Sequence, residues 1–276
     1  EHHLAHIASS YYCSPFDRLT AGFSYDASGD FASAMAARCE GTEIKVLDRV
    51  SLPDSLGFFY TALCQFIGFD AFGEEYKVMG LASYGEDHYH DEMTQLLHLH
   101  DDGWFKLNAK YFGMHNGGKS GEVDTADNLV MGQLYQNRMT ELFGLPAERG
   151  SLGQREKDIA RSTQLRFEEA ALHCLNRLHH LVPTENLAMA GGCALNGVAN
   201  ARILRESAFT TPYLQAASSD DGTCLGAAFW VWHNTLGQKT RFHMKHNFWG
   251  PEYSDQDHRK AVETTGLNIP ADTMDA

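Results

Sequence analysis

The longest regular pattern of apolar positions in the chain lies between residues 155 and 181. Apolar side chains recur there near the spacing of a helix, at Ile159, Leu165, Ala170, Leu172, Leu175 and Leu178. This period predicts one long helix with a buried face. The apolar run "NLAMA" at 186–190 follows it and predicts a short buried strand.

Shorter patterns predict strands and helices along the rest of the chain. We expect strands at 20–25, 31–37 and 44–50, a turn at 26–30, and helices at 2–12, 54–67 and 73–83. Strand-and-loop material is expected from 103 to 125. Because strands alternate with helices, the sequence predicts an α/β architecture.

Composition and charge narrow the classes of function. The chain has 276 residues, of which 43% are hydrophobic and 21% charged, enough for one large domain or two lobes. Its net charge of −14 repels phosphate backbones, so no nucleic-acid partner is expected, and cationic small molecules are favoured. No run approaches the ~20 apolar residues that a membrane span needs, so no membrane partner is expected.

The cysteines and the first residues bear on where the protein works. Six cysteines occur without paired spacing, which is typical of reduced thiols and predicts a cytoplasmic location. The opening "EHHLAH" contains no initiator Met. We therefore expect a fragment of a longer protein, or a numbering that starts at the first ordered residue.

The stretch "GMHNGGKS" at 113–120 matches the phosphate-loop pattern, with Gly113, Gly118, Lys119 and Ser120 at its fixed positions. Such a loop needs a buried strand before it and a helix directly after it. The preceding "WFKLNAKYF" alternates as a half-exposed strand does, and the following "GEVDTADN" is rich in turn residues. We predict a surface loop here, and a P-loop nucleotide hydrolase remains the minor alternative.

The stretch "HHLAH" places His2 and His6 four residues apart. On a helix this spacing puts both imidazoles on one face, where they can bind one metal ion. Metalloproteases with this spacing have Glu after the first His, whereas this chain has His3. A surface helix that happens to be rich in His is the alternative.

In "SYDASGD", Asp26, Ser28, Gly29 and Asp30 follow a β-rich run. A carboxylate at a strand end, followed by a small turn, can hold a metal ion or admit a phosphate to the backbone. A simple hairpin turn is the alternative interpretation of the same residues.

Two further stretches carry candidate binding residues. In "AGGCALN", Gly191 and Gly192 end a buried strand and Asn196 opens a predicted helix, so a nucleotide can lie against the backbone, or helix and strand can pack closely. In "SDDGTCLGAA", Asp220 and Asp221 precede a Gly turn and a helix of small residues. Two acids there either cap the helix or bind a metal.

These motifs, in this order, resemble the NodU/CmcH-type carbamoyltransferases, a group that includes nodulation, cephem and aminoglycoside O-carbamoyltransferases. The similar stretches are "HHLAHIASSYY", "SYDASGD", "EEYKVMGLASYG", "DGWFKLNAKYF", "AGGCALNGVANARI" and "SDDGTCLGAA". "DIARSTQ" at 158–164 is also similar to tRNA threonylcarbamoyl-modifying proteins and hydrogenase-maturation carbamoyltransferases.

The resemblance implies a fold and a metal site. The fold would be an actin-like ATPase (ASKHA, RNase H-like) α/β domain, with two βα lobes around a cleft and the 155–181 helix near that cleft. The metal would be held by His2, His6, Asp26 and Asp220, and a one-residue slip of the alignment would select Asp221 instead. Imidazoles together with carboxylates suit Fe(II), which we favour, or Mn(II) or Zn(II).

The resemblance also implies a reaction. In this family a carbamoyladenylate, made from ATP and carbamoyl phosphate, passes its carbamoyl group to a substrate hydroxyl. The adenylate would lie against Ser28, Gly29, Gly191, Gly192 and Asn196. The acceptor would be a small molecule.

The candidate catalytic residues are less well specified. Lys77 in "EEYKVMG" is a candidate for a supporting charge near the adenylate, and a helix Lys paired with Glu74 or Glu75 is the alternative. A general base for the acceptor hydroxyl is also needed. His3 and Asp30 are both candidates.

Residues 1–276 would then be a partial domain. Relatives carry a phosphate-loop segment ahead of this region and a YrdC-like domain after it, and neither is recognised in the sequence. We therefore expect a YrdC-like domain as a partner and incomplete activity from the chain alone. A non-catalytic metal-binding and nucleotide-binding module is the rival function.

Overall fold

The computed structural model describes residues 1–116, 121–123 and 129–266. The chain divides into two compact units, Glu1–His243 and Met244–Ala276. In the described part of the second unit, helix α9 (Asp255–Thr265) begins at Ser254, whose hydroxyl accepts from the Asp257 amide, and ends at a left-handed Gly266. All the candidate site residues lie in the first unit.

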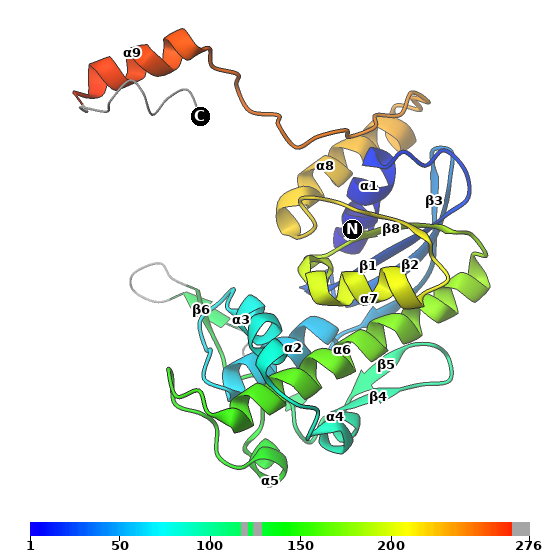
Figure 1. The fold of residues 1–276 in the computed structure, drawn as a ribbon. Helices are drawn as coiled ribbons and strands as arrows, with labels where there is room; N and C mark the ends of the chain where they lie inside the picture. Colours follow the sequence, from blue (N-terminus) through cyan, green and yellow to red (C-terminus); the bar gives the residue numbers. More distant parts are fainter. Residues whose placement is uncertain (117–120, 124–128, 267–276) are drawn as a thin grey trace. The chain divides into compact units, whose positions relative to one another are not determined.

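A five-stranded mixed sheet forms the centre of the first unit (Figure 1). Its strands are β1 (Thr20–Gly29), β2 (Ala32–Glu40), β3 (Glu43–Ser51), β8 (Asn186–Ala190) and β9 (Thr211–Leu214), in the order β3-β2-β1-β8-β9. The first three strands form an antiparallel meander, and β8 and β9 extend the sheet in parallel from β1. The predicted mixed α/β class is confirmed.

Helices cover both faces of the sheet because its central strands bury side chains on both sides. Helix α1 (His2–Cys13) packs with Met35, Ala37 and Ala188 on one face, and α8 (Thr223–Trp230) lies beside α1. The alternate residues Phe23 and Tyr25 face a second core with α2 (Leu56–Phe66) and α6 (Gln154–Leu181). This period-two division between the faces is what a doubly covered sheet requires.

The predicted long helix is confirmed as α6, whose buried face runs from Ile159 through Phe167 to Leu178. It packs against β1, α2 and α7 (Gly197–Glu206), and against α3 (Glu75–Leu81) and α4 (His90–Leu96). Helix α5 (Thr140–Phe143) is a single short turn. The candidate site lies on the side of the molecule that is supported by the core between the sheet and α6.

The resemblance implies two βα lobes, but the described residues outside the central sheet form no second large sheet. Outside the central sheet, they contain only pairs of three-residue strands, β4 (Leu97–Leu99) with β5 (Phe105–Leu107) and β6 (Gly121–Val123) with β7 (Leu129–Met131). The core beyond the central sheet is built instead by α2, α3, α4 and α6. Their apolar residues recur at helical spacing, so helix packs on helix there.

The segment that matches the phosphate-loop pattern is described only over residues 113–116. Its first residues form a 3-10 turn (Gly113–Asn116), and strand β6 follows it where a P-loop has a helix. Gly118, Lys119 and Ser120 lie outside the described residues. No helix among the described residues has the length and apolar character needed to cross a membrane.

Close packing of α8 on α1 depends on Gly226. A Cβ atom at this position would lie 1.8 Å from the carbonyl oxygen of Ala5, a backbone atom that cannot move aside cheaply. We predict that Gly226→Ala lowers the free energy of unfolding by about 3 kcal/mol. Urea unfolding followed by circular dichroism measures it.

The matched control is Gly80→Ala on α3, where an added Cβ meets nothing within 4 Å. This substitution should raise the free energy of unfolding by about 0.5 kcal/mol, because alanine restricts the unfolded chain. Equal effects of the two substitutions would contradict the close approach of α1 and α8.

Candidate metal centre and adjoining cavity

Helix α1 presents two imidazoles at its first turns. The Nε2 atoms of His2 and His6 lie 3.0 Å apart, as the four-residue spacing on a helix predicts. His6 is fully buried, and its Nδ1 has no hydrogen-bond partner in the structure. The ring orientation of His6 therefore depends on packing and on the partners of Nε2.

Asp26 comes from an irregular part of β1. Tyr25 pairs with Ala34 and Gly29 with Ala32, so β1 has two more residues than β2 in this stretch. Such a bulge turns side chains out of the regular alternation. The strand therefore continues through the predicted turn at 26–30, and the turn itself lies at Asp30 and Phe31, both with positive φ.

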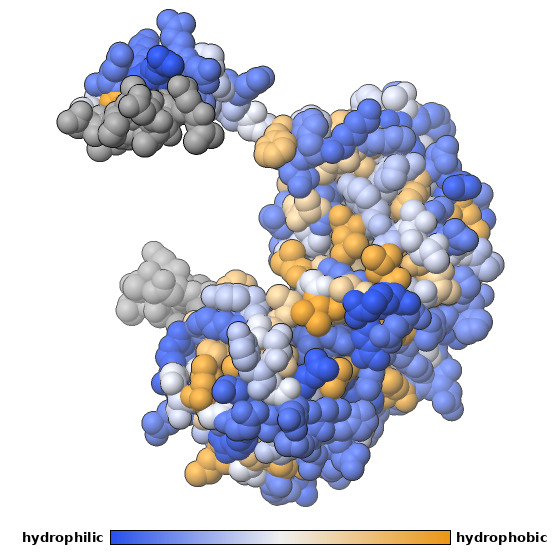
Figure 2. Space-filling view, viewed as in Figure 1, coloured by the Kyte–Doolittle hydropathy of each residue, from blue (hydrophilic) through white to orange (hydrophobic). Residues whose placement is uncertain are grey.

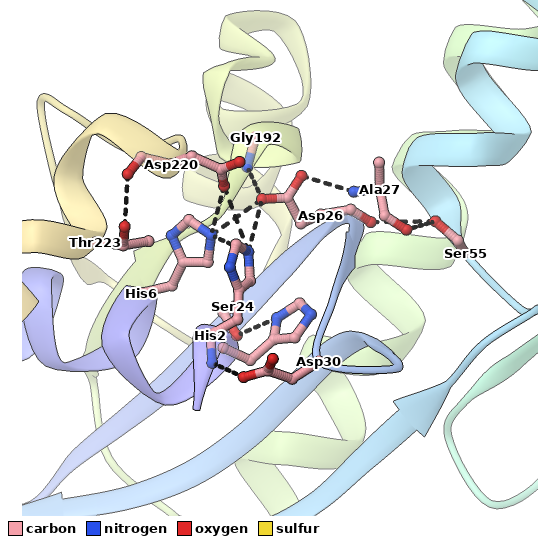
Figure 3. Close-up of polar contacts among 11 residues, drawn as sticks. His2, His6, Ser24, Asp26, Ala27, Asp30, Ser55, Gly192, Asp220 and Thr223 are labelled. Carbon is pink, nitrogen blue, oxygen red and sulfur yellow. Dashed lines mark hydrogen bonds and ion pairs between the residues drawn. The ribbon is translucent and has the colours of Figure 1, made fainter. Parts of the chain in front are cut away.

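The bulge directs the Asp26 carboxylate at the two imidazoles (Figure 3). Its Oδ2 lies 3.0 Å from His6 Nε2 and 3.9 Å from His2 Nε2. The main-chain N–H of Gly192 donates to Oδ2 at 3.0 Å, and that of Ala27 donates to Oδ1 at 2.6 Å. The carboxylate therefore connects α1, β1 and the turn after β8.

Asp220 completes the group from the 3-10 turn Asp220–Gly222 ahead of α8. Its Oδ1 lies 3.4 Å from each of the two imidazole Nε2 atoms. The Asp220 side chain is 71% exposed, whereas that of Asp26 is 13% exposed. Asp221 is not a member of the group. The group thus has a buried side and an open side.

The geometry of the four residues fits a single metal ion. One ligand atom from each residue can be chosen so that all four lie within 4.8 Å of one another. Two ligand atoms bound ~2.1 Å from one ion are about 3.0 Å apart at a right angle and about 3.4 Å apart at the tetrahedral angle. Four of the observed separations, 3.0 to 3.4 Å, agree with these values. The separation of 3.9 Å between His2 Nε2 and Asp26 Oδ2 corresponds to a wider angle at the ion.

Electrostatic interactions among the four residues favour the charged forms of Asp26 and His2. Burial acts to raise the pKa of Asp26, but hydrogen bonds from His2, His6 and the Gly192 and Ala27 amides outweigh it and hold the pKa well below its usual range. The hydrogen bond to Asp26 raises the pKa of His2, against the effect of burial. An ionised carboxylate is therefore ready to accept a cation.

Neither predicted general base lies on the cavity that adjoins this group. His3 is fully buried behind it, its Nδ1 lies 3.0 Å from Ser24 Oγ, and burial lowers its pKa to about 4. Asp30 Oδ2 accepts from the main-chain N–H of His2 at 2.7 Å and so holds the start of α1. A general base must reach the substrate, so neither residue is placed to act on a molecule in this cavity.

Lys77 is also away from this cavity. Its ammonium donates to Glu74 and lies 5.2 Å from the centre of the Phe69 ring. The pairing with Glu74 was the alternative expected for a helix lysine. Lys77 does not line the cavity, so the structure gives its placement near an adenylate no support.

The group opens onto a cavity of about 640 Å³. Asp26 and Asp220 belong both to the group and to the cavity wall. The rest of the wall is lined by Ala27, Ser28, Gly57, Phe58, Tyr60, Thr61, Phe72, Gly73, Glu75, Tyr76, Met79, Phe167, Gly192, Cys193, Leu195, Asn196 and Ser219. Figure 2 shows hydrophobic residues gathered where this unit is hollowed. Phe167 brings α6 to the cavity, as expected for the long helix.

The predicted nucleotide-binding residues divide into two sets. Ser28, Gly192 and Asn196 line the cavity, whereas Gly29 and Gly191 do not. A Cβ at Gly29 would lie 2.0 Å from His2 Cδ2, and one at Gly191, where φ is +102°, would lie 2.1 Å from the Tyr25 carbonyl oxygen. These two glycines allow close packing rather than contact with a ligand.

Asn196 has a structural task besides lining the cavity. Its Oδ1 accepts from the Ala199 amide and so caps α7, and it also accepts from Gln164 Nε2, both at 3.0 Å. Asn196 Nδ2 donates in return to Gln164 Oε1 at 3.0 Å. The orientation of this amide is therefore set from both sides.

Sequence reasoning missed the residues of α2 and α3 that line the cavity. Tyr60 and Thr61 come from α2, and Glu75, Tyr76 and Met79 from α3. The motif "EEYKVMG" drew attention only to Lys77. The helical spacing of 75, 76 and 79 in that motif could have shown that these residues share a face.

Comparison with known proteins places the chain in a family. The family described as "Carbamoyltransferase N-terminus" matches residues 1–229. The chain belongs to this carbamoyltransferase family. The resemblance inferred from its motifs is confirmed.

Relatives of this carbamoyltransferase chain include two nodulation proteins. It is 32% identical to nodulation protein NolNO of Sinorhizobium fredii, over 95% of this chain and 35% of that protein. It is 30% identical to nodulation protein NolO of Bradyrhizobium diazoefficiens, over 92% and 42%. An uncharacterised Synechocystis protein is 36% identical over 93% and 40%. The chain thus spans less than half the length of these relatives.

Among solved structures, HypF of T. kodakarensis is similar over 86% of this carbamoyltransferase chain and 37% of its own. The TM-score is 0.41 and the sequence identity 18%.

We predict that the purified chain binds about one divalent ion at the group of His2, His6, Asp26 and Asp220. The double substitution His2→Ala with His6→Ala should abolish binding, because it removes both nitrogen ligands. Elemental analysis after gel filtration measures the bound metal. Undiminished metal in the double variant would refute the site.

A matched pair of variants tests which aspartate takes part. Asp220→Asn should weaken metal binding ~10- to 100-fold, whereas Asp221→Asn should leave it nearly unchanged, because only Asp220 lies beside the imidazoles. Competition with a chelating dye measures both affinities. A larger loss in Asp221→Asn would show that the neighbouring residue is the ligand.

Proposed function

We propose that this domain binds a divalent metal ion and a carbamoyladenylate, and transfers the carbamoyl group to a hydroxyl of a small-molecule acceptor. One observation carries the proposal. Asp26 and Asp220 belong at once to the four-residue group and to the wall of the cavity, so a cation held by the group would face a molecule in the cavity.

The residues of the group suit the proposed metal. Two imidazoles and two carboxylates are ligands typical of Fe(II), which we favour, and of Mn(II) or Zn(II). When bound, the ion would supply positive charge to the phosphate of the adenylate and polarise the mixed anhydride. The protein's part is to hold the ligands, with Gly192 and Ala27 fixing the carboxylate of Asp26.

The cavity suits the adenosine half of the proposed ligand. Its volume of about 640 Å³ lies in the range of small-molecule sites, and its wall is largely apolar with a few polar groups, as such sites usually are. A Cβ at Gly192 would lie 2.8 Å from Asp26 Oδ1, so glycine keeps the backbone open beside the carboxylate. We place the adenosine against Gly192 and Asn196, with Ser28 near the phosphate.

The formation of the adenylate from ATP and carbamoyl phosphate belongs, in this proposal, to a YrdC-like domain. The chain spans 35 to 42% of its relatives, so there is room in proteins of that length for a further domain. We further propose a cytoplasmic setting, because ATP is available there. The net charge of −14 favours a cationic acceptor.

If metal and adenylate share the site, each must strengthen binding of the other, and the enhancement must be reciprocal. We predict a coupling of ~1–3 kcal/mol between the two ligands. Titration calorimetry with and without chelator measures it on the wild type and on Asp220→Asn, which should lose most of the coupling. Equal affinity for the nucleotide with and without metal would refute a shared site.

A second pair of variants separates this proposal from the phosphate-loop alternative. Gly192→Val should abolish nucleotide binding, because the side chain would enter the cavity beside Asp26. Lys119→Ala should have little effect. The reverse result would favour a phosphate loop at 113–120.

Transfer itself is tested with preformed carbamoyladenylate, which bypasses the activating domain. Release of AMP that depends on both the chain and an added alcohol is the expected result. Tight binding of the adenylate without any release would favour the non-catalytic binding module.

A further inference from the structure

The cavity wall also holds a carboxylate that neither the metal group nor the adenylate accounts for. Among the described residues that line the cavity, the carboxylates are Asp26, Asp220 and Glu75, and the first two belong to the group. The described residues of the wall include no His, Lys or Arg, and burial raises the pKa of the Cys193 thiol well above its usual value. Besides the phenols of Tyr60 and Tyr76, Glu75 is therefore the ionisable side chain of the described wall that remains to accept a proton from a bound molecule.

Glu75 stands next to space for such a molecule. It shares a face of α3 with Tyr76 and Met79, which also line the cavity. Phe72, just before the helix, lines it too, and the side chains of Phe72 and Tyr76 are each 64% exposed. Exposed aromatic rings beside a carboxylate form a surface on which an organic acceptor can pack.

The hydrogen-bond partner of Glu75 can satisfy it in both protonation states. Thr61 Oγ1 lies 2.8 Å from Glu75 Oε1 and 3.0 Å from the Gly57 carbonyl oxygen. A hydroxyl has one hydrogen to donate, and its oxygen can also accept. When Glu75 is ionised, Thr61 donates to it, and when Glu75 is protonated, Glu75 can donate to Thr61 while Thr61 donates to Gly57.

We propose that Glu75 is the general base of the transfer reaction, and that the α3 wall of Phe72, Tyr76 and Met79 receives the acceptor. This inference rests on the proposed carbamoyl transfer. The acceptor oxygen forms a bond to the carbamoyl carbon, and the bond from that carbon to the bridging phosphate oxygen breaks. The electron pair leaves with AMP, and the hydroxyl proton passes to Glu75, which later releases it to water.

The neighbouring Glu74 offers a matched control. It does not line the cavity, and its carboxylate pairs with Lys77 and, at 2.9 Å, with Arg149. The Ala71 amide also donates to it at 3.0 Å. Glu74 and Glu75 are thus adjacent residues of one type that differ in whether they face the cavity.

The experiment compares two nucleophiles on the full chain with metal and preformed carbamoyladenylate. Ethylene glycol must lose a proton as it attacks, whereas hydroxylamine attacks as a neutral amine and needs no base beforehand. AMP release is measured against the concentration of each, which gives kcat and KM. Binding of the adenylate is measured separately by calorimetry.

For Glu75→Gln we expect kcat with ethylene glycol to fall ~100-fold or more, the usual effect of losing a general base. The rate with hydroxylamine and the affinity for the adenylate should not change, because glutamine keeps an oxygen that can accept from Thr61. Glu74→Gln should match the wild type with both nucleophiles. Thr61→Val should lower kcat with ethylene glycol alone, and Thr61→Ser should restore it.

The contrary outcomes are distinct. Equal losses with both nucleophiles, or a weaker affinity for the adenylate, would overturn the assignment of Glu75 as base, and so would unchanged kcat with ethylene glycol. If the wild type releases no AMP with either nucleophile, the proposed transfer function fails instead.

Discussion

The carboxylate of Asp26 is the contact on which the candidate site depends. It accepts from main-chain amides of its own strand and of the turn after β8, and it lies against both imidazoles of α1. A buried carboxylate is costly unless it is paired and hydrogen-bonded. Its partners come from segments more than a hundred residues apart, so α1, β1 and β8 must come together before the group exists.

An irregular stretch of strand β1 brings the Asp26 carboxylate to these partners. The bulge in β1 releases Asp26 from the regular alternation, and the turn at Asp30 and Phe31 holds the first residue of α1 beside it. Gly29 and Gly191 permit backbone approaches that any side chain would block. Gly29 and Asp30, which the sequence suggested as part of a ligand-binding turn, instead help to hold the metal group in place.

The cavity combines an acidic wall with an aromatic wall, and this division suits group transfer. Metal and phosphate would occupy the side formed by β1 and the turn before α8, and the acceptor the side formed by α3. The hydrogen bonds between Gln164 and Asn196 fix the orientation of the Asn196 amide in the cavity wall. The chain belongs to the carbamoyltransferase family, while the actin-like fold assignment stays a prediction.

Short sequence patterns were enough to predict several elements of the fold and part of the metal group. The helical period predicted α6, the apolar run at 186–190 predicted β8, and the spacing of His2 and His6 placed both rings on one face. The sequence did not reveal strand β9 and helix α4, which are short, or helix α9, which buries no residue.

Only the tertiary structure decided which polar residues share a cavity. Local spacing says which residues lie on one face of a helix, but not what that face meets. His3 and Asp30 were expected to reach the substrate, yet one is buried behind the metal group and the other holds the start of α1. Glu75 was overlooked beside Lys77, because the fold of α3 against α2 and α6, rather than the motif, turns its carboxylate toward the cavity.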